Sequence, residues 1–403
     1  MPAQGEVDEF TTAYAPFRIR HASGAVSATP TVAVIGGGVI GLSCARELAL
    51  AGADVTVYDR PHHGRPSDVA AGMLAPTCEL DYGEVDLHHL TAESLALWPG
   101  FAASLERESA VDVGLRPEGT LVLAADPDER ARLDRRARHW DEHGLSYRRL
   151  TGRECRQCEP ALSRRVLAGL EVDTDLSVDN RAVMRALRNA LEPTGVRFVD
   201  ALAEPVRDGD VVRAVRSPDG EQAVDVVVLA AGVWSGALAD AIGLDPPLRP
   251  MKGQQLRVHS PDEIIRRTIR ARVDEVDIYL VPRRDGTIVV GGTSEDVGLD
   301  LRRTPRAAMD LLTAACALVP ELRDVELIEH GVGLRPATTD NQPLIGRTGL
   351  PGLILATGHF RHGFLLAPVT AAAVRAAVLD EPLPTAALPF SPSRDLLKEN
   401  ATP

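Results

Sequence analysis

The sequence contains no long hydrophobic run and no excess of positive charge. None of its apolar stretches approaches the about 20 residues that cross a lipid bilayer. The 403-residue chain has a net charge of -13, which disfavours binding to nucleic acid or to anionic membranes through basic patches. Residues 1–30 lack the basic start and apolar core of a signal peptide. We therefore expect a cytoplasmic protein without nucleic-acid or membrane partners, with residues 1–30 as a disordered extension.

Cysteine is scarce, and no complete metal-binding pattern is present. Of the five cysteines, Cys155 and Cys158 have the spacing of a redox or zinc pair. No second pair and no histidine cluster accompanies them, as a zinc site would require. We interpret them as two thiols at a helix or turn and expect no metal and no disulfide, which leaves any redox role open.

A glycine-rich turn organises the start of the chain. An apolar strand leads into GGGVIG (36–41), and a helix-compatible segment and a second strand follow, closed by Asp59. Gly36 permits a tight turn, Gly38 lets the backbone approach a pyrophosphate, and Gly41 lets the helix pack closely on the sheet. The helix N-terminus offers free N–H groups to phosphates, and Asp59 can accept hydrogen bonds from a ribose. The complete order of elements favours a dinucleotide site over a turn without a ligand.

Two later segments repeat the pattern of a strand followed by a turn. The apolar run at 224–231 is typical of a parallel strand buried on both faces, so Gly232 is expected at the ligand crevice. A strand at 353–357 ends in a glycine-rich turn before another helix, which would bring a second helix N-terminus to the same ligand. A chain of this length predicts two domains. The nucleotide domain is then assembled from three pieces, with the other domain inserted between them.

Seven ordered motifs carry a resemblance to a known family. They are the glycine turn, AAGMLAP (70–76), AAGVWS (230–235), MKGQQLRV (251–258), YLVPRRDG (279–286), GVGLRPATTD (331–340) and ATGHFRHGFLLAP (356–368). Together they resemble the FAD-dependent D-amino-acid oxidase family, and within it the glycine oxidases of thiazole (thiamine) biosynthesis. The resemblance extends from about residue 31 to residue 379.

The resemblance implies an α/β fold with two domains. A Rossmann-like FAD-binding domain, with a parallel sheet and helices, would comprise residues 31–110, 172–248 and 329–385. An α+β substrate-binding domain with an antiparallel sheet would comprise residues 111–171 and 249–328, and residues 386–403 would form a flexible tail.

The resemblance also assigns roles to single residues. Arg335 would pair with the substrate carboxylate, as a guanidinium does in bidentate fashion. Tyr279 would donate a second hydrogen bond to that carboxylate, and Arg361 would lie beside the substrate. No acid–base residue is required, so none is assigned as catalytic. The FAD contacts would come from Gly36, Gly38, Val39, Ile40, Gly41, Asp59, Arg60, Ser67, Ala71, Gly72, Met73, Val206, Gly232, His359, Phe360, Arg361, His362, Gly363, Phe364 and Leu365.

Several of these residues also have plain structural interpretations. Arginines and tyrosines often serve surface or packing roles, and only the motifs favour a functional role here. Lys252 begins a strand, so we expect it in solvent and leave it out of the site. The cofactor loop has one hydroxyl, Ser67, where the family often has two. Ser294 stands where the family usually has a hydrophobic residue, which leaves the preferred substrate size open.

The implied activity is flavin-dependent oxidative deamination. Glycine, sarcosine or small D-amino acids would give the imine and then the 2-oxo acid, with ammonia and hydrogen peroxide, and the product would feed thiazole formation. The implied partners are the amino acid, oxygen and further copies of the chain, as a homo-oligomer that could be a tetramer. The alternatives are a dehydrogenase that uses an acceptor other than oxygen, and a non-catalytic FAD-binding subunit of a heteromeric oxidase. Neither the preferred amino acid nor the oligomeric state follows from the sequence.

Overall fold

The computed structural model describes residues 29–60 and 62–394. The expected N-terminal extension therefore lies almost entirely outside the described residues. The first part of the expected tail is packed: residues Thr385–Phe390 form a 3-10 helix, η6, and Phe390 is fully buried against α4 (Val85–Ser109) and α10 (Ala367–Leu379). Within the described residues, no helix is both long enough and apolar enough to pass through a membrane.

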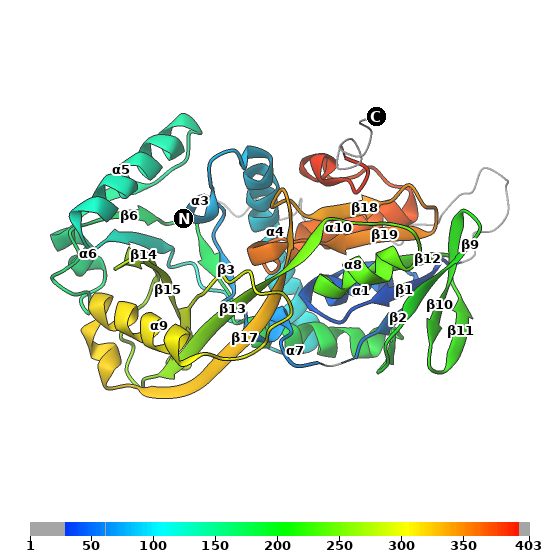
Figure 1. Cartoon of the computed structure of the whole chain (residues 1–403), viewed down its shortest axis with the longest axis horizontal. Coiled ribbons are helices and arrows are strands. Elements are labelled where there is room, and N and C mark those ends of the chain that lie inside the picture. The colour runs from blue at the N-terminus through cyan, green and yellow to red at the C-terminus, as the bar shows by residue number, and fades with distance from the viewer. Residues whose placement is uncertain (1–28, 61, 395–403) are drawn as a thin grey trace, which may run out of the picture.

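A six-stranded sheet forms one half of the molecule (Figure 1), in the order β18-β19-β12-β1-β2-β8. Its strands run parallel except β18, which pairs antiparallel with β19. Aliphatic and β-branched residues fill the central strands because both faces of this sheet are covered. The strands are β18 (Leu344–Arg347), β19 (Leu353–Thr357), β12 (Val226–Leu229), β1 (Thr31–Ile35), β2 (Asp54–Tyr58) and β8 (Arg197–Val199).

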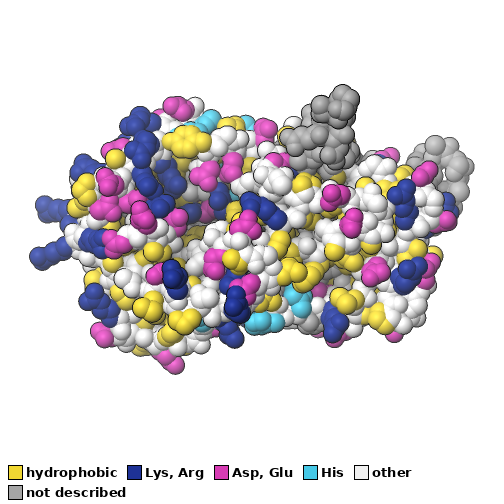
Figure 2. All heavy atoms as spheres, viewed as in Figure 1, with side chains coloured by type: hydrophobic (Ala, Val, Ile, Leu, Met, Phe, Trp, Pro, Cys, Tyr) yellow, Lys and Arg dark blue, Asp and Glu magenta, His cyan; other side chains and the backbone are white. Residues whose placement is uncertain are grey.

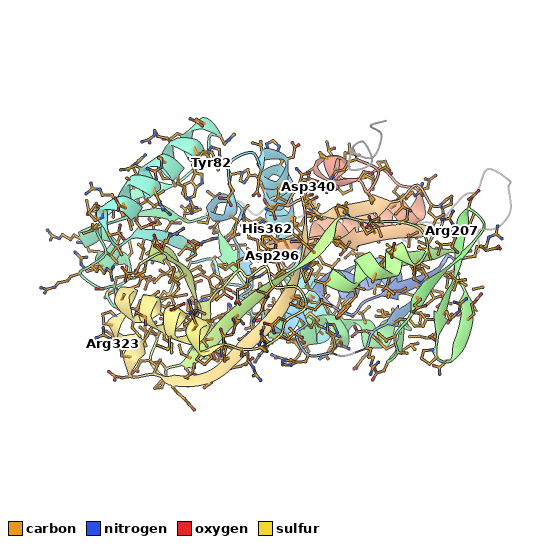
Figure 3. All side chains as sticks on the ribbon, in the orientation of Figure 1. Tyr82, Arg207, Asp296, Arg323, Asp340 and His362 are labelled. Atoms are coloured by element: carbon orange, nitrogen blue, oxygen red, sulfur yellow. The ribbon has the colours of Figure 1, made fainter. Side chains whose placement is uncertain are left out.

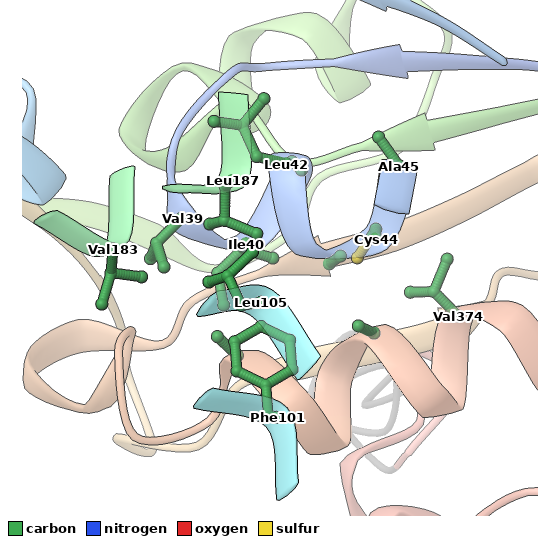
Figure 4. Packing of buried hydrophobic residues seen from close by; sticks show 14 of the residues in the cluster. Val39, Ile40, Leu42, Cys44, Ala45, Phe101, Leu105, Val183, Leu187 and Val374 are labelled. Carbon is green, nitrogen blue, oxygen red and sulfur yellow. The ribbon is translucent and has the colours of Figure 1, made fainter. Parts of the chain in front are cut away.

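Helices cover one face of this sheet. Helices α1 (Val39–Leu50), α7 (Asn180–Leu191) and α10 pack on it, and α4 packs against α7 and α10. Figure 4 shows Phe101 and Leu105 of α4 beside Ile40 of α1 in the shared hydrophobic core. The other face carries α8 (Ser235–Asp240) and a three-stranded antiparallel sheet of β9 (Glu204–Asp208), β10 (Val211–Ser217) and β11 (Gly220–Ala223).

An eight-stranded sheet forms the other half, in the order β17-β13-β16-β15-β14-β4-β6-β5. Neighbouring strands are antiparallel except β14 and β4, which are parallel. Helix α9 (Pro305–Leu318) packs on one face and α5 (Pro127–Glu142) on the other. The strands are β17 (Glu326–Thr338), β13 (Leu248–His259), β16 (Thr287–Gly291), β15 (Val276–Pro282), β14 (Thr268–Val273), β4 (Thr120–Ala124), β6 (Ala168–Val172) and β5 (Arg148–Thr151).

Short elements complete the described chain. They are α2 (Pro66–Val69), α3 (Pro76–Glu79), α6 (Gly152–Cys158), the strand pair β3 (Met73–Leu74) and β7 (Leu176–Ser177), and the 3-10 helices η2 (Glu192–Thr194), η3 (Gly232–Trp234), η4 (Pro320–Arg323) and η5 (Phe360–His362).

The long strands β13 and β17 connect the two halves. They pair from Leu248 with Thr338 to His259 with Glu326, and run diagonally from the eight-stranded sheet towards the parallel one (Figure 1). The α/β fold expected from the sequence is confirmed. The division into an FAD-binding and a substrate-binding domain remains a proposal, and both strands extend across its boundaries near residues 248 and 329.

Candidate active site

The glycine turn between β1 and α1 has the geometry that its spacing predicts. Gly36 has a φ of 114°, and a Cβ atom there would overlap the carbonyl oxygen of Ala230. A Cβ atom at Gly41 would overlap the carbonyl oxygen of Gly36, so Gly41 allows α1 to approach the turn. The first turn of α1 has no acidic residue, and its N-cap residue is Gly38. Ser67 Oγ accepts a hydrogen bond from the N–H of Val39 at 3.0 Å. This hydroxyl adds no charge, so the positive end of the helix still favours an anion.

Asp59 is held in place at the end of β2. It accepts a hydrogen bond from Gly37 N at 2.9 Å, and its two carboxylate oxygens accept from Nη2 of Arg65 at 2.9 and 2.8 Å. These contacts orient the carboxylate towards the glycine turn. The sequence around Arg65 does not single this residue out, because it lies in a loop without a recognisable motif.

Buried polar contacts fix the segment that follows. Nδ2 of Asn180 donates to the carbonyl oxygen of Ser67 at 2.9 Å, and Nη2 of Arg257 donates to Oδ1 of Asn180 at 2.9 Å. The buried guanidinium of Arg283 donates to the carbonyl oxygen of Ala71. Arg257 of β13 and Arg283, in the turn after β15, thus position a segment that lines the cavity. Neither the spacing nor the composition of that segment indicated these contacts.

A cavity of about 1290 Å³ runs between the two sheets. Pockets for drug-sized ligands measure roughly 300–1,000 Å³, so this one has room for a dinucleotide and a small substrate. It brings together all three predicted substrate residues and most of the predicted cofactor residues: Gly36, Gly38, Val39, Ile40, Asp59, Arg60, Ser67, Ala71, Gly72, Met73, Gly232, His359, Phe360, Arg361, His362, Gly363, Phe364 and Leu365. In Figure 3, His362 lies near the centre of the molecule and Tyr82, at the cavity rim, lies towards α5.

Two predicted cofactor residues lie outside the cavity lining. Gly41 is behind the turn, where its role is close packing. Val206 lies in β9 and pairs with Ala214 of β10, beyond the point where the chain leaves the cavity. Ala203 and Glu204 line the cavity instead, and the assignment of Val206 as an FAD contact remains a prediction.

Arg335 and Tyr279 line the same cavity, each above a glycine of a neighbouring strand. A Cβ atom at Gly253 would overlap the Arg335 guanidinium, and one at Gly291 would overlap the Tyr279 ring. Nη1 of Arg335 donates to the carbonyl oxygen of Thr293 at 2.9 Å. This bond leaves further guanidinium donors for a carboxylate.

Arg361 lines the cavity but is already paired with acidic residues. Its Nε lies 2.6 Å from Oε2 of Glu79, and its Nη2 lies 3.0 Å from Oδ2 of Asp81 and 3.5 Å from Oε2 of Glu84. Glu79 also pairs with Arg270 of β14, another cavity residue. Arg361 is therefore compensated by its own neighbours. Neither Glu79 nor Arg270 belongs to a sequence motif that indicated this contact.

Lys252 is buried, contrary to the expectation from its place at a strand start. Only 1% of the residue is exposed, and Nζ lies 3.1 Å from Oδ2 of Asp300 and 3.5 Å from Oε2 of Glu295. Lys252 also exchanges both backbone hydrogen bonds with Glu295. The ammonium group thus ties β13 to the loop that carries Thr293 and Ser294 into the cavity.

Two buried histidines at the cavity are held neutral. Burial lowers the pKa of His359 to about 3, and its Nε2 lies 2.9 Å from Oγ1 of Thr370. Burial, followed by the nearby charge of Arg361, lowers the pKa of His362 well below its usual range. Neither ring gains a proton near neutral pH.

Neither the cysteines nor the described acidic and histidine side chains form a metal site, whereas the cavity suits a dinucleotide. Cys155 packs in the hydrophobic core of the eight-stranded sheet, and Cys155 and Cys158 are both free thiols on α6. Across residues 29–60 and 62–394, no group of three His, Cys, Asp or Glu side chains is placed to hold a metal ion.

Three features of the cavity fit FAD. They are the positive N-terminus of α1, the carboxylate of Asp59 and the available volume.

The fold and the glycine turn define a dinucleotide-binding enzyme of the α/β class. The model of the DAO family, described as FAD dependent oxidoreductase, matches residues 31–377, and the chain belongs to this family. The chain is 34% identical to the glycine oxidase of Pseudomonas aeruginosa, over 84% of this chain and 92% of that protein. The crystal structure of glycine oxidase from Geobacillus kaustophilus superposes with a TM-score of 0.84 at 30% identity, covering 91% of this chain and 99% of that one.

Some similar proteins are much longer than this chain. The bifunctional protein ThiO/ThiG of Nostoc sp. is 35% identical over 88% of this chain. The chain spans 53% of that relative's length. The protein is thus an FAD-dependent oxidoreductase similar to glycine oxidases.

Proposed function

We propose that this protein is an amino-acid oxidase that deaminates glycine or another small amino acid. The observation that carries the proposal is the placement of Arg335 and Tyr279, each above a glycine, in the same cavity as a dinucleotide-binding turn. Arg335 binds the α-carboxylate through charge-assisted hydrogen bonds, and Tyr279 donates another. Together they orient the α-carbon and the amine within the cavity.

Bound FAD supplies the two-electron acceptor for this oxidation. The amine is oxidised to an imine, which water hydrolyses to the 2-oxo acid and ammonia, while oxygen is reduced to hydrogen peroxide. For glycine, one glycine, one oxygen and one water give glyoxylate, ammonia and hydrogen peroxide. The neutral rings of His359 and His362 add no positive charge beside the substrate amine.

The likeness to ThiO/ThiG proteins supports a further part of the proposal, that the product enters thiazole formation for thiamine. Sarcosine and small D-amino acids are alternative substrates that the resemblance allows. Assembly into a homo-oligomer, such as a tetramer, remains a prediction that light scattering tests.

The deciding experiment follows glycine consumption, oxygen uptake and peroxide formation with the purified protein. Equal amounts of oxygen consumed and peroxide formed support the oxidase. Glycine oxidation without peroxide would instead indicate a dehydrogenase, and a yellow protein that glycine does not bleach under nitrogen would indicate a non-catalytic FAD-binding subunit.

A further inference from the structure

One arginine beside the cavity is buried without an acidic partner. Arg283 is 6% exposed and stands directly after β15. Its Nη2 donates to the carbonyl oxygen of Ala71, and its Nε and Nη1 have no hydrogen-bond partner among the described residues. On the face shown in Figure 2, Lys and Arg side chains lie at the surface with Asp and Glu side chains among them. Arg283 differs from these, since its charge is enclosed by protein.

The alternation of strand β15 relates Arg283 to the substrate residues. Alternate residues of a strand point to one face of a sheet, so Tyr279, Val281 and Arg283 share a face. The ladder continues through Arg283, whose N–H donates to the carbonyl oxygen of Thr287 at 2.8 Å. The backbones of Tyr279 and Arg283 are about 14 Å apart along this strand. The guanidinium contacts Ala71, which packs in the same cluster as Tyr279.

The wall of the cavity in front of Arg283 is apolar. Ala71 packs with Val281 and Val289, which are fully buried, and Met73 and Tyr279 border this cluster. Ala71, Met73 and Tyr279 line the cavity, and the guanidinium lies behind Ala71. A charge behind an apolar wall acts on its surroundings with less screening than a charge in water.

The charge of Arg283 is not cancelled by its neighbours. The charged groups that act on it are Asp179, Asp285, Arg257 and Arg116, in which two negative charges oppose two positive ones. Burial lowers the pKa of Arg283 to about 10, so the group is still protonated at neutral pH. The wall at Ala71 is therefore backed by a net positive charge.

We propose that Arg283 stabilises the reduced form of bound FAD over the oxidised form and so favours oxidation of the substrate. In the proposed reaction the Cα–H bond breaks and its hydrogen leaves with both electrons for FAD, while the C=N bond forms and the nitrogen then loses a proton. Negative charge is thereby transferred to the cofactor, and a fixed positive charge nearby stabilises it. The placement of the accepting ring near Ala71 rests on the proposed function, because Arg335 and Tyr279 hold the substrate at this part of the cavity.

The test measures the midpoint potential of the bound flavin, by reduction under nitrogen beside a reference dye. R283Q removes the charge and keeps an amide donor. We expect it to shift the reduction equilibrium at least about tenfold towards oxidised FAD. For a two-electron couple this is a midpoint potential about 30 mV lower. R283K keeps the charge and should stay within about threefold of wild type.

R284Q is the matched control. Arg284 is the next residue of the same turn, but it is exposed and pairs with Asp112, so its loss should leave the potential unchanged. The affinity for oxidised FAD, measured by fluorescence, and the melting temperature show whether a variant has lost its structure, which the potential of the bound flavin does not report.

A wild-type potential in FAD-loaded R283Q would overturn the inference. If R283Q cannot be loaded with FAD, R283K decides: a wild-type potential there supports the role of the charge, and a potential lowered by about 30 mV or more overturns it. The measurement uses no amino acid. An R283Q potential that falls as expected in a protein that does not oxidise glycine would therefore contradict the proposed function alone.

Discussion

The guanidinium of Arg335 occupies the space above Gly253 on the adjacent strand. Gly253 pairs with Gly333 in the β13–β17 ladder, two residues from Arg335, so the side chain crosses diagonally over the glycine. A Cβ atom at Gly253 would overlap that guanidinium. Its Nη1 is also bonded to the carbonyl oxygen of Thr293. The candidate carboxylate site therefore depends on residues from three separate segments.

Replacing Arg335 tests its proposed contact with the carboxylate. Arg335→Ala should lower kcat/KM for glycine by roughly 30- to 1,000-fold, which corresponds to about 2–4 kcal/mol for the loss of a charge-assisted hydrogen-bonded pair. Steady-state peroxide assays measure this change. The control is Arg249→Ala, an exposed arginine of β13 that pairs with Asp296 and should change activity little. An unchanged KM in Arg335→Ala would contradict the assignment.

A methyl group at Gly253 should displace Arg335 and leave the fold intact. The atoms that it would overlap are at the end of a flexible side chain, so Gly253→Ala should raise KM for glycine about tenfold or more and change the melting temperature little. Gly100→Ala in α4 is the control, because no neighbouring atom lies within 4 Å of the added methyl. That control should keep normal KM and gain about 0.5–1 kcal/mol of stability. Normal KM in Gly253→Ala would show that Arg335 does not need this space.

Gly41→Ala should weaken FAD binding by disturbing the glycine turn. Here the added methyl would meet the backbone oxygen of Gly36, which cannot move without opening the turn. We expect a protein that purifies with little FAD and has lost about 1–3 kcal/mol or more of stability. The ratio of flavin to protein absorbance and thermal melting measure the two effects. Gly349→Ala, at an open position, should retain full flavin content; a fully flavinated Gly41→Ala protein would disprove the steric argument.

The buried carboxyl of Asp175 should make stability depend on pH. Burial raises its pKa to about 7, and this effect outweighs the opposing effect of the neighbouring polar groups of Cys78, Thr120 and Thr77. Its pKa in the unfolded chain is about 3.9, so between about pH 4 and pH 7 the folded state binds more protons and stability falls as pH rises. Asp175→Asn should therefore melt at a higher temperature than wild type at about pH 8, with the difference shrinking towards about pH 4.

The exposed Asp128 provides the comparison for that measurement. Asp128→Asn should follow the wild-type pH profile, because its carboxylate is in solvent in both states. The explanation would be wrong if the melting temperature of the wild type increased relative to that of Asp175→Asn between pH 4 and pH 7.

Much of the cofactor side could be predicted from the sequence. The glycine turn, the strand before it and Asp59 are close in the chain, and their conformations follow from local spacing and from the steric freedom of glycine. Arg335 and Tyr279 were also found, since each belongs to a motif that resembles a known family. Gly36, Gly38, Asp59, Tyr279 and Arg335 all line one cavity.

Only the tertiary structure decided the remaining features. Whether Lys252 is buried, whether Arg361 is compensated by Glu79, and whether Val206 or Ala203 reaches the cavity depend on residues distant in sequence. Sequence determined where the chain turns and which residues can bind a phosphate or a carboxylate. The charge state and the neighbours of each side chain were decided by long-range packing, because burial and ion pairing are properties of the assembled core.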